Sequence, residues 1–243
     1  VTGGSIGLGS YMATGLAEAG ANIVIAARKF ERSVEKCKEL EQLGVKALPV
    51  KCDVTVSEDL QNLVDTTVKE FGSLDILVNN AGLSWNHDSM TYPLDKWHKV
   101  FDTNIHGVFE LCVLAGKVMK EQGGGKIINI ASVAGFIGAY PRVQDTVAYN
   151  ASKGAVVILT KDLAMKWARY GIHVNAIAPG YFPTHMSKHL LEKTQDFVIH
   201  SIPLRRFGGE DDLKGLVVLL ASPASNYITG QTIIMDGGMT CGA

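Results

Sequence analysis

Four of the eight residues at positions 2–9 are glycines, in the sequence Thr2-Gly3-Gly4-Ser5-Ile6-Gly7-Leu8-Gly9. Its glycines at positions 3, 7 and 9 permit a tight turn and a close approach of the backbone to a ligand. A helical pattern begins at once, and a helix N-terminus offers free N–H groups and a positive dipole to an anion such as a pyrophosphate. The turn alone also fits an ordinary strand-to-helix connection, so its meaning depends on its surroundings.

Apolar segments rich in Val and Ile follow at intervals. Each is too continuous for a strand with one exposed face, which predicts strands buried on both faces over residues 22–27, 47–52, 74–78, 126–131 and 172–178. A helical pattern precedes each of the first three strands, over residues 7–19, 31–43 and 57–71. A glycine follows each of these helical patterns. Ser57 is expected to cap the third helix, with Glu58 and Asp59 in its first turn.

This alternation predicts a doubly wound α/β fold, a parallel sheet with helices on both faces, in a single domain over residues 1–243. Ligands of such folds bind beyond the carboxyl ends of the strands. Val1 would be the last residue of the first strand, so we expect the natural chain to contain earlier residues that complete it.

Composition narrows the classes of partner. The chain has 243 residues, 47% of them hydrophobic, and a net charge of −1 from 23 basic and 24 acidic residues without a basic block, which argues against nucleic acid and membrane partners. Its apolar runs are far shorter than the ~20 residues of a membrane span. The four cysteines lie far apart, without a CxxC pair or metal-ligand spacing, and no secretory signal opens the chain, so we expect reduced thiols, no metal and a cytoplasmic location.

The end of the second expected strand points to a cofactor. In dinucleotide-binding folds an acidic residue there binds the ribose 2′-hydroxyl, whereas arginine accommodates a 2′-phosphate. Here Ala27 is followed by Arg28 and Lys29, and Glu31 lies four residues too late. NADP(H) is therefore favoured, and NAD(H) or a merely solvated pair of cations stays possible.

Tyr149 and Lys153 are four residues apart within a helical pattern, so both side chains lie on one face of the helix. A phenol has a pKa near ~10, and a nearby ammonium in a desolvated cleft would lower it toward neutrality. The spacing alone equally fits an exposed tyrosine beside a solvated lysine.

Several motifs stand in a fixed order along the whole chain. They are TGxxxGxG at Thr2 to Gly9, Asp53 in Cys-Asp-Val, Asn79-Asn80-Ala81-Gly82, Asn104, Ser132, the YxxxK of Tyr149 and Lys153, and Pro179-Gly180 with Thr184. In this order the sequence resembles the short-chain dehydrogenase/reductase family over almost every residue. The resemblance implies a catalytic tetrad of Asn104, Ser132, Tyr149 and Lys153.

The resemblance also implies a role for each residue. Tyr149 would be the general acid in reduction, Ser132 would hydrogen-bond the substrate oxygen, and Lys153 would lower the pKa of the phenol and hold the nicotinamide ribose. Asn104 would interrupt a helix and hold a proton-relaying water. The implied cofactor contacts are Gly3, Ser5, Ile6, Gly7, Gly9, Arg28, Lys29, Asp53, Val54, Asn80, Ala81, Gly82, Tyr149, Lys153, Pro179, Gly180, Phe182 and Thr184.

Two segments are expected to shape the substrate site, residues 136–146 and a lid over residues 181–207 that carries basic residues. Trp85 and His87 are candidate substrate contacts. His185 and His189 lack the glutamate of a zinc motif. The resemblance favours a 3-oxoacyl thioester reductase, with a gluconate 5-dehydrogenase-like enzyme as the alternative, and a non-catalytic nucleotide-binding regulator as a third possibility.

The helical segments around Val108 and around the catalytic tyrosine are apolar over more than one stripe. A helix packed on one sheet needs a single stripe, so the surplus predicts a second buried face, unless loops of the same chain cover it. Related enzymes pair these helices across a two-fold axis, which implies a homotetramer whose interface includes Val108, Cys112, Val156 and Trp167.

Overall fold

The computed structural model describes residues 1–139, 143–184 and 188–242, the side chains of residues 188–193 excepted. Strands β1 (Ile23–Ala27) and β2 (Ala47–Lys51) pair in parallel. Four more parallel strands follow in the order β3-β4-β5-β6, namely β3 (Ile76–Asn79), β4 (Gly125–Ile130), β5 (Ile172–Pro179) and β6 (Thr232–Met235).

Residues 1–3 lie between β1 and β3 and join the two groups of strands. Thr2 forms a parallel bridge with Ala26, and Gly3 N donates to the Ala26 carbonyl at 2.8 Å. On the other side, Thr2 N donates to the Val78 carbonyl at 3.0 Å. The glycine-rich turn therefore begins between β1 and β3, in the middle of a continuous set of parallel strands.

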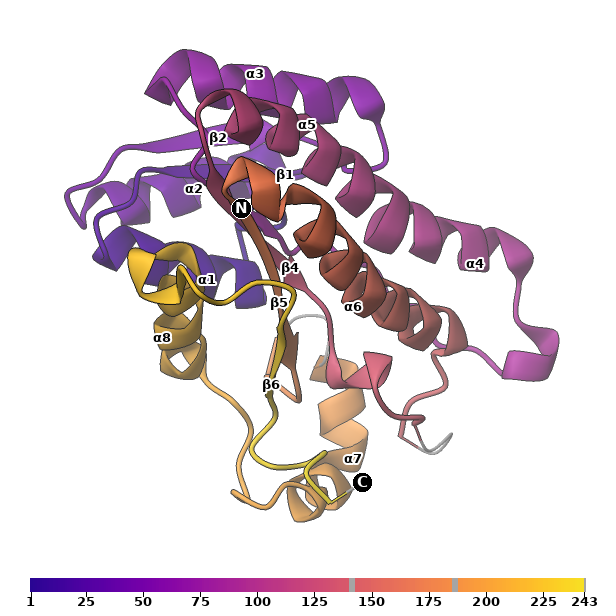
Figure 1. Cartoon of the computed structure of the whole chain (residues 1–243). Coiled ribbons are helices and arrows are strands. Elements are labelled where there is room, and N and C mark those ends of the chain that lie inside the picture. The colour runs from indigo at the N-terminus through magenta and orange to yellow at the C-terminus, as the bar shows by residue number, and fades with distance from the viewer. Residues whose placement is uncertain (140–142, 185–187, 243) are drawn as a thin grey trace.

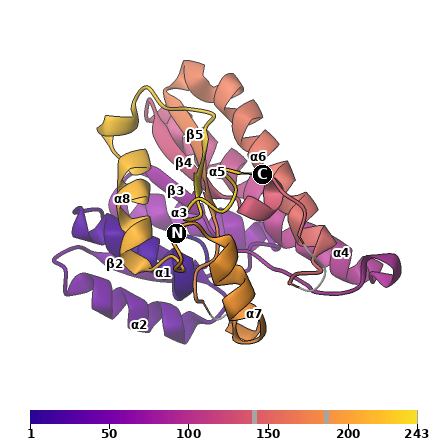
Figure 2. The same cartoon turned by 90° about the horizontal axis from the view of Figure 1, so that it is seen from below.

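Helices cover both faces of the strands (Figures 1 and 2), as the alternating pattern predicts. One core packs α1 (Gly7–Glu18), α2 (Phe30–Glu41) and α8 (Glu210–Ala221) against the strands, and the other packs α3 (Ser57–Phe71), α5 (Gly107–Glu121) and α6 (Val147–Trp167). Adjacent strand residues face opposite cores, Val24 toward α3 and α5 and Ile25 toward α1 and α8, because side chains alternate along a strand. The doubly wound α/β class is confirmed.

Two further helices lie away from these layers. Helix α4 (Leu94–Phe101) precedes α5 and extends to one side of the molecule, and α7 (Lys188–Ser201) lies beyond one end of the strands (Figure 1). None of the helices in the described ranges is long and apolar enough to cross a lipid bilayer.

Two local predictions are wrong. Strand β2 is not buried on both faces, because it lies at the edge of the sheet, where Pro49 costs no hydrogen bond and Val50 alone is fully buried. Ser57 is the first residue of α3 and not its cap, a position that Val56 takes without a side-chain bond. The Asp59 carboxylate instead accepts from Asp53 N at 2.8 Å, which ties the helix start to the end of β2.

The predicted interface residues are also corrected. Val108, Cys112 and Val156 are buried within a single chain, so they are not available to a partner. They are covered because α5 and α6 pack on the sheet and on neighbouring segments. The Trp167 ring, for example, lies against Gly116 of α5, where a Cβ atom would come within 3.1 Å of it. The exposed apolar side chains of these helices include Phe109 and Ile158.

Candidate active site

The expected catalytic residues meet at the carboxyl ends of the strands. Ser132 follows β4, and Ala131 N donates to Ile177 of β5 at 2.8 Å, so the segments after β4 and β5 leave the sheet side by side. Ser132 also caps a short 3₁₀ turn, since its hydroxyl accepts from Ala134 N at 3.2 Å. Its position serves both a local cap and a site at this edge.

Lys153 is the buried charged group of the site. Its side chain is 5% exposed, and Nζ donates to the Ile130 carbonyl at 2.6 Å. The same Nζ lies 5.5 Å from the centroid of the Tyr149 ring. The four-residue spacing on α6 therefore brings the two groups together, as the sequence predicts.

Asn104 lies in a helical break, as the resemblance implies. Residues Asp102–His106 form a π-helical turn between α4 and α5, and π-turns are frequent at functional sites. Asn104 Oδ1 accepts from Leu83 N at 2.8 Å, and Nδ2 donates to the Leu83 carbonyl and to Ser152 Oγ, both at 2.9 Å. The side chain thereby links the segment after β3 to α6.

The pKa of Tyr149 departs from the expected direction. Burial raises the pKa of this phenol, and the nearby Tyr181 adds to the increase, while a hydrogen bond with Ser132 opposes it. Burial also lowers the pKa of Lys153, to about 8. In this structure desolvation thus raises the pKa of Tyr149, and the Lys153 ammonium donates to the Ile130 carbonyl. A lowering of this pKa by Lys153 stays a prediction.

The glycine turn is held from behind by Asn80. Its Nδ2 donates to the carbonyls of Thr2 at 2.9 Å and Gly3 at 3.2 Å. A Cβ atom at Gly9 would lie 2.4 Å from this Nδ2, so the position requires glycine. The ribose contact that the resemblance implies for Asn80 stays a prediction, and the structure shows that its amide also positions the turn.

The turn leads into α1 with a free helix end. Gly7 begins the helix at φ +58°, and Ile6 at the cap position offers no side-chain acceptor to the first N–H groups. Those groups and the dipole remain available to an anion. Thr184 lies against this end, since a Cβ atom at Gly7 would lie 3.4 Å from its Cγ2.

Arg28 and Asp53 come together from neighbouring strand ends. Arg28 is exposed beyond β1, and its charge acts on Asp53, which follows β2. Burial alone would raise the pKa of Asp53, but hydrogen bonds from Thr55 and the charges of Arg28 and Lys99 lower it overall. The next residue, Val54, packs its carbonyl on Gly107, where a Cβ atom would lie only 2.1 Å away.

The segment after β5 closes the opposite side. Gly180 N donates to Met235 of β6 at 2.9 Å, and Phe182 is buried. One basic residue of the expected lid is neutralised here, because Arg206 pairs with both carboxylate oxygens of Asp212, at 2.6 and 2.8 Å. The side chains of Lys188, His189 and Lys193 are outside the described part of the chain, and so is the whole of His185.

The loop with Trp85 and His87 contacts the segment before the catalytic helix. His87 N donates to the Asp145 carbonyl, and Asp145 N donates to Asn86 Oδ1, both at 2.8 Å. Trp85 is exposed, and the Nζ atom of Lys96 lies 5.1 Å from the centroid of its ring. The contact of Asn86 could not be predicted from the sequence, because a lone asparagine in a loop carries no signal. Arg142, in the expected site segment 136–146, lies outside the described residues.

Comparisons with known proteins agree with this geometry. Residues 3–240 match the family model described as enoyl-(acyl carrier protein) reductase. The chain is 42% identical to the 2-dehydro-3-deoxy-D-gluconate 5-dehydrogenase of Escherichia coli K12, over 98% of this chain and 93% of the relative. It is 38% identical to the 3-oxoacyl-[acyl-carrier-protein] reductase FabG of Staphylococcus aureus Mu50, over 98% and 96% of the two chains.

A solved structure extends the comparison to the fold. The gluconate 5-dehydrogenase of Burkholderia cenocepacia in complex with NADP and tartrate is 37% identical, with a TM-score of 0.93 over 99% of this chain and 93% of that one. The chain belongs to the short-chain dehydrogenase/reductase family, whose members are NAD(P)-dependent oxidoreductases acting on CH–OH and keto groups.

Proposed function

We propose that the protein interconverts a ketone and a secondary alcohol with NADP(H), and that Asn104, Ser132, Tyr149 and Lys153 carry the reaction. The observation that carries the proposal is the buried Lys153 ammonium beside the Tyr149 ring, with Ser132 hydrogen-bonded to the same phenol. Burying a lysine is costly, and such groups concentrate at functional sites.

Each residue of the tetrad has a part in moving the proton. When bound, the reduced cofactor supplies the hydride. Because burial keeps the pKa of Tyr149 raised, the phenol is protonated near neutrality and can donate to the oxygen that becomes an alcohol. Ser132 holds that oxygen by a second hydrogen bond, which stabilises the charge that develops on it.

Lys153 can return the proton. With a pKa of about 8, it carries a proton at neutral pH and can release it more easily than an exposed lysine. Asn104, bonded to Ser152 and to Leu83, fixes the helix turn next to this lysine, and a water held there would connect it to solvent.

The residues around the glycine turn fit a dinucleotide with a 2′-phosphate. The free N-terminus of α1 suits the pyrophosphate, and Asp53 and Val54, which follow β2, would contact the adenine. Arg28 is exposed beside that position and can pair with the 2′-phosphate, and the related structure with NADP supports this preference. NAD(H) remains the second cofactor.

For the substrate we propose a 3-oxoacyl thioester of acyl carrier protein or coenzyme A. Its support is an apolar cluster beside the site, in which Val198 and Ile202 of the lid are packed by Val143, Tyr181, Phe207 and Met239. The alternative is a keto sugar acid, which the 42% identity to the gluconate-type relative favours. An intact tetrad argues against a non-catalytic regulator.

The test is a substrate panel with NADPH, comparing acetoacetyl thioester and 5-ketogluconate in wild type and Tyr149→Phe. Wild type should reduce one of them, and the variant should lose turnover while it retains NADPH binding, measured by cofactor fluorescence. Binding of NADPH without turnover of any carbonyl by the wild type would instead revive the regulator.

We also propose that residues 1–243 form one domain with a lid over residues 181–207 and that four chains assemble. In this assembly, exposed apolar side chains of α5 and α6, Phe109 and Ile158 among them, would meet those of a second copy. Light scattering would then give about four times the mass of a 26.1 kDa chain.

A further inference from the structure

Tyr181 brings a second phenol to the candidate active site. It lies two residues beyond the end of β5, and Ser132 lies two residues beyond the end of β4, its neighbour in the sheet. Ile130 pairs with Ile177, so both residues leave the same edge of the sheet. In agreement with this placement, Tyr181 contributes to the raised pKa of the Tyr149 phenol.

The backbone around Tyr181 is fixed on both sides. Gly180 N donates to Met235 at 2.9 Å, and the Tyr181 carbonyl accepts from Gly208 N at 3.0 Å. Its ring packs on Val198 and Ile202 of the lid helix, together with other apolar side chains. The ring also borders a cavity of about 150 Å³ that lies between the lid and the end of β6. The phenol is thus held in place by packing.

The hydroxyl of Tyr181, in contrast, makes no hydrogen bond within the described residues. Ser132 and Tyr149 already contact each other, and Asp236, which also lines the cavity, accepts from Gly238 N, Thr240 N and Thr240 Oγ1. Tyr181 is half-buried, and its hydroxyl is not among the buried polar atoms without a partner, so it is open to a ligand or to solvent. A fixed ring with an unpaired polar end is the arrangement of a recognition residue.

We propose that Tyr181 is a specificity-determining residue that hydrogen-bonds a second oxygen atom of the substrate, one or two carbons from the reacting ketone. The proposal rests on the proposed function, because Ser132 and Tyr149 must hold the ketone oxygen. A 3-oxoacyl thioester carries such an oxygen two carbons away, and a keto sugar acid carries one on the adjacent carbon. Both candidate substrates therefore carry a second oxygen atom within two carbons of the ketone, which a plain ketone lacks.

The experiment compares Tyr181→Phe with wild type on two matched pairs of ketones, using NADPH. Ethyl acetoacetate is paired with 2-heptanone, and hydroxyacetone with 2-butanone. The first member of each pair carries an ester group or a hydroxyl where its match of equal chain length carries only hydrocarbon. We expect kcat/KM for an oxygen-bearing ketone to fall about five- to tenfold, mostly through KM, and its hydrocarbon match to change less than about twofold. The pair that responds identifies the position of the oxygen.

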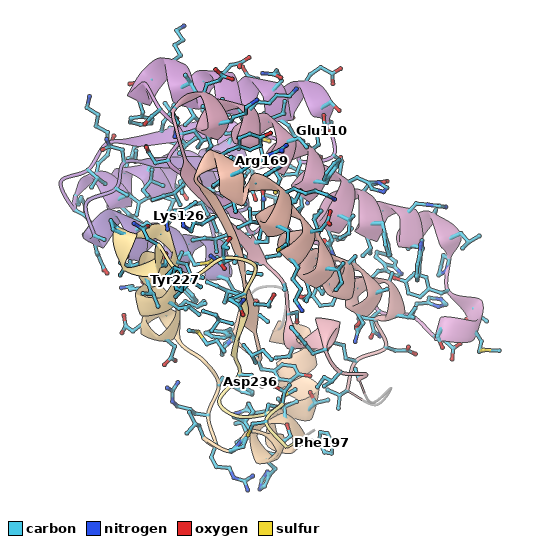
Figure 3. The ribbon with its side chains drawn as sticks, viewed as in Figure 1. Glu110, Lys126, Arg169, Phe197, Tyr227 and Asp236 are labelled. Carbon is cyan, nitrogen blue, oxygen red and sulfur yellow. The ribbon has the colours of Figure 1, made fainter. Side chains whose placement is uncertain are left out.

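Tyr227→Phe is the matched control, because this tyrosine is fully exposed and lies away from the end of the molecule that carries Asp236 and α7 (Figure 3). Equal losses within both pairs would show that Tyr181 only supports the fold, and no loss in either would also overturn the proposal. Calorimetric binding of the same ketones to protein loaded with NADP⁺ reports on Tyr181 without turnover. If wild type binds but reduces none of the four, the proposed reaction fails, while the binding difference still decides the role of Tyr181.

Discussion

The buried Lys153 should cost the protein stability at neutral pH. Its ordinary pKa is 10.5, and burial lowers it to about 8. At about 1.4 kcal/mol per pKa unit, the ionised side chain destabilises the folded state by about 3 kcal/mol. The folded protein binds fewer protons than the unfolded chain between these two pKa values, so the stability of the wild type should rise with pH in that window.

The perturbation is Lys153→Met, which keeps the length of the side chain and removes the charge. The variant lacks the rise, so relative to wild type it should be more stable at pH 7 than at pH 10, by about 2 to 3 kcal/mol. The lost hydrogen bond to the Ile130 carbonyl lowers the stability of the variant at every pH and changes the slope little. The variant should also lose catalytic turnover.

The assay is urea unfolding of both proteins at pH 7, 8, 9 and 10 without cofactor. Lys161→Met, an exposed lysine on the same helix, corrects for the general loss of one positive charge. A difference between wild type and Lys153→Met that stays constant from pH 7 to pH 10 would refute the reasoning, because it would mean that burial does not disfavour the ammonium.

Three further outcomes follow from the same structure. Arg28→Ala should weaken the binding of NADPH by about 1.5–3 kcal/mol and that of NADH far less, as measured by fluorescence titration. Equal losses of binding for both cofactors would exclude a role at the 2′-phosphate. Gly107→Ala should lower the free energy of unfolding by about 1–3 kcal/mol, since its Cβ would lie 2.1 Å from the Val54 carbonyl. Gly215→Ala, with nothing within 4 Å of the new Cβ, should instead stabilise α8 by up to about 1 kcal/mol, and denaturation of both variants checks the pair. Ile158→Asp should reduce the mass seen in light scattering, and an unchanged mass would place the interface elsewhere.

The pKa of Tyr149 shows where a pair of residues is not enough. The spacing of Tyr149 and Lys153 determines that both groups share a helix face, and the structure has them together. The direction of each pKa depends on how much water the surrounding chain excludes, which no local pattern contains. Burial therefore raised the pKa of the phenol, against the expected direction, and it lowered that of the ammonium, for which no expectation followed from the sequence.

The alternation of strands and helices, the glycine turn and the helix ends at Gly20, Gly44 and Gly72 could all be predicted from the sequence. These features depend on side-chain periodicity and on backbone conformations with positive φ, both of which are local. Tertiary structure alone decided that β2 is an edge strand and that Val108 and Cys112 are buried by their own chain. It also decided that Asn80 lies behind the glycine turn, because burial and pairing arise from segments far apart in the chain.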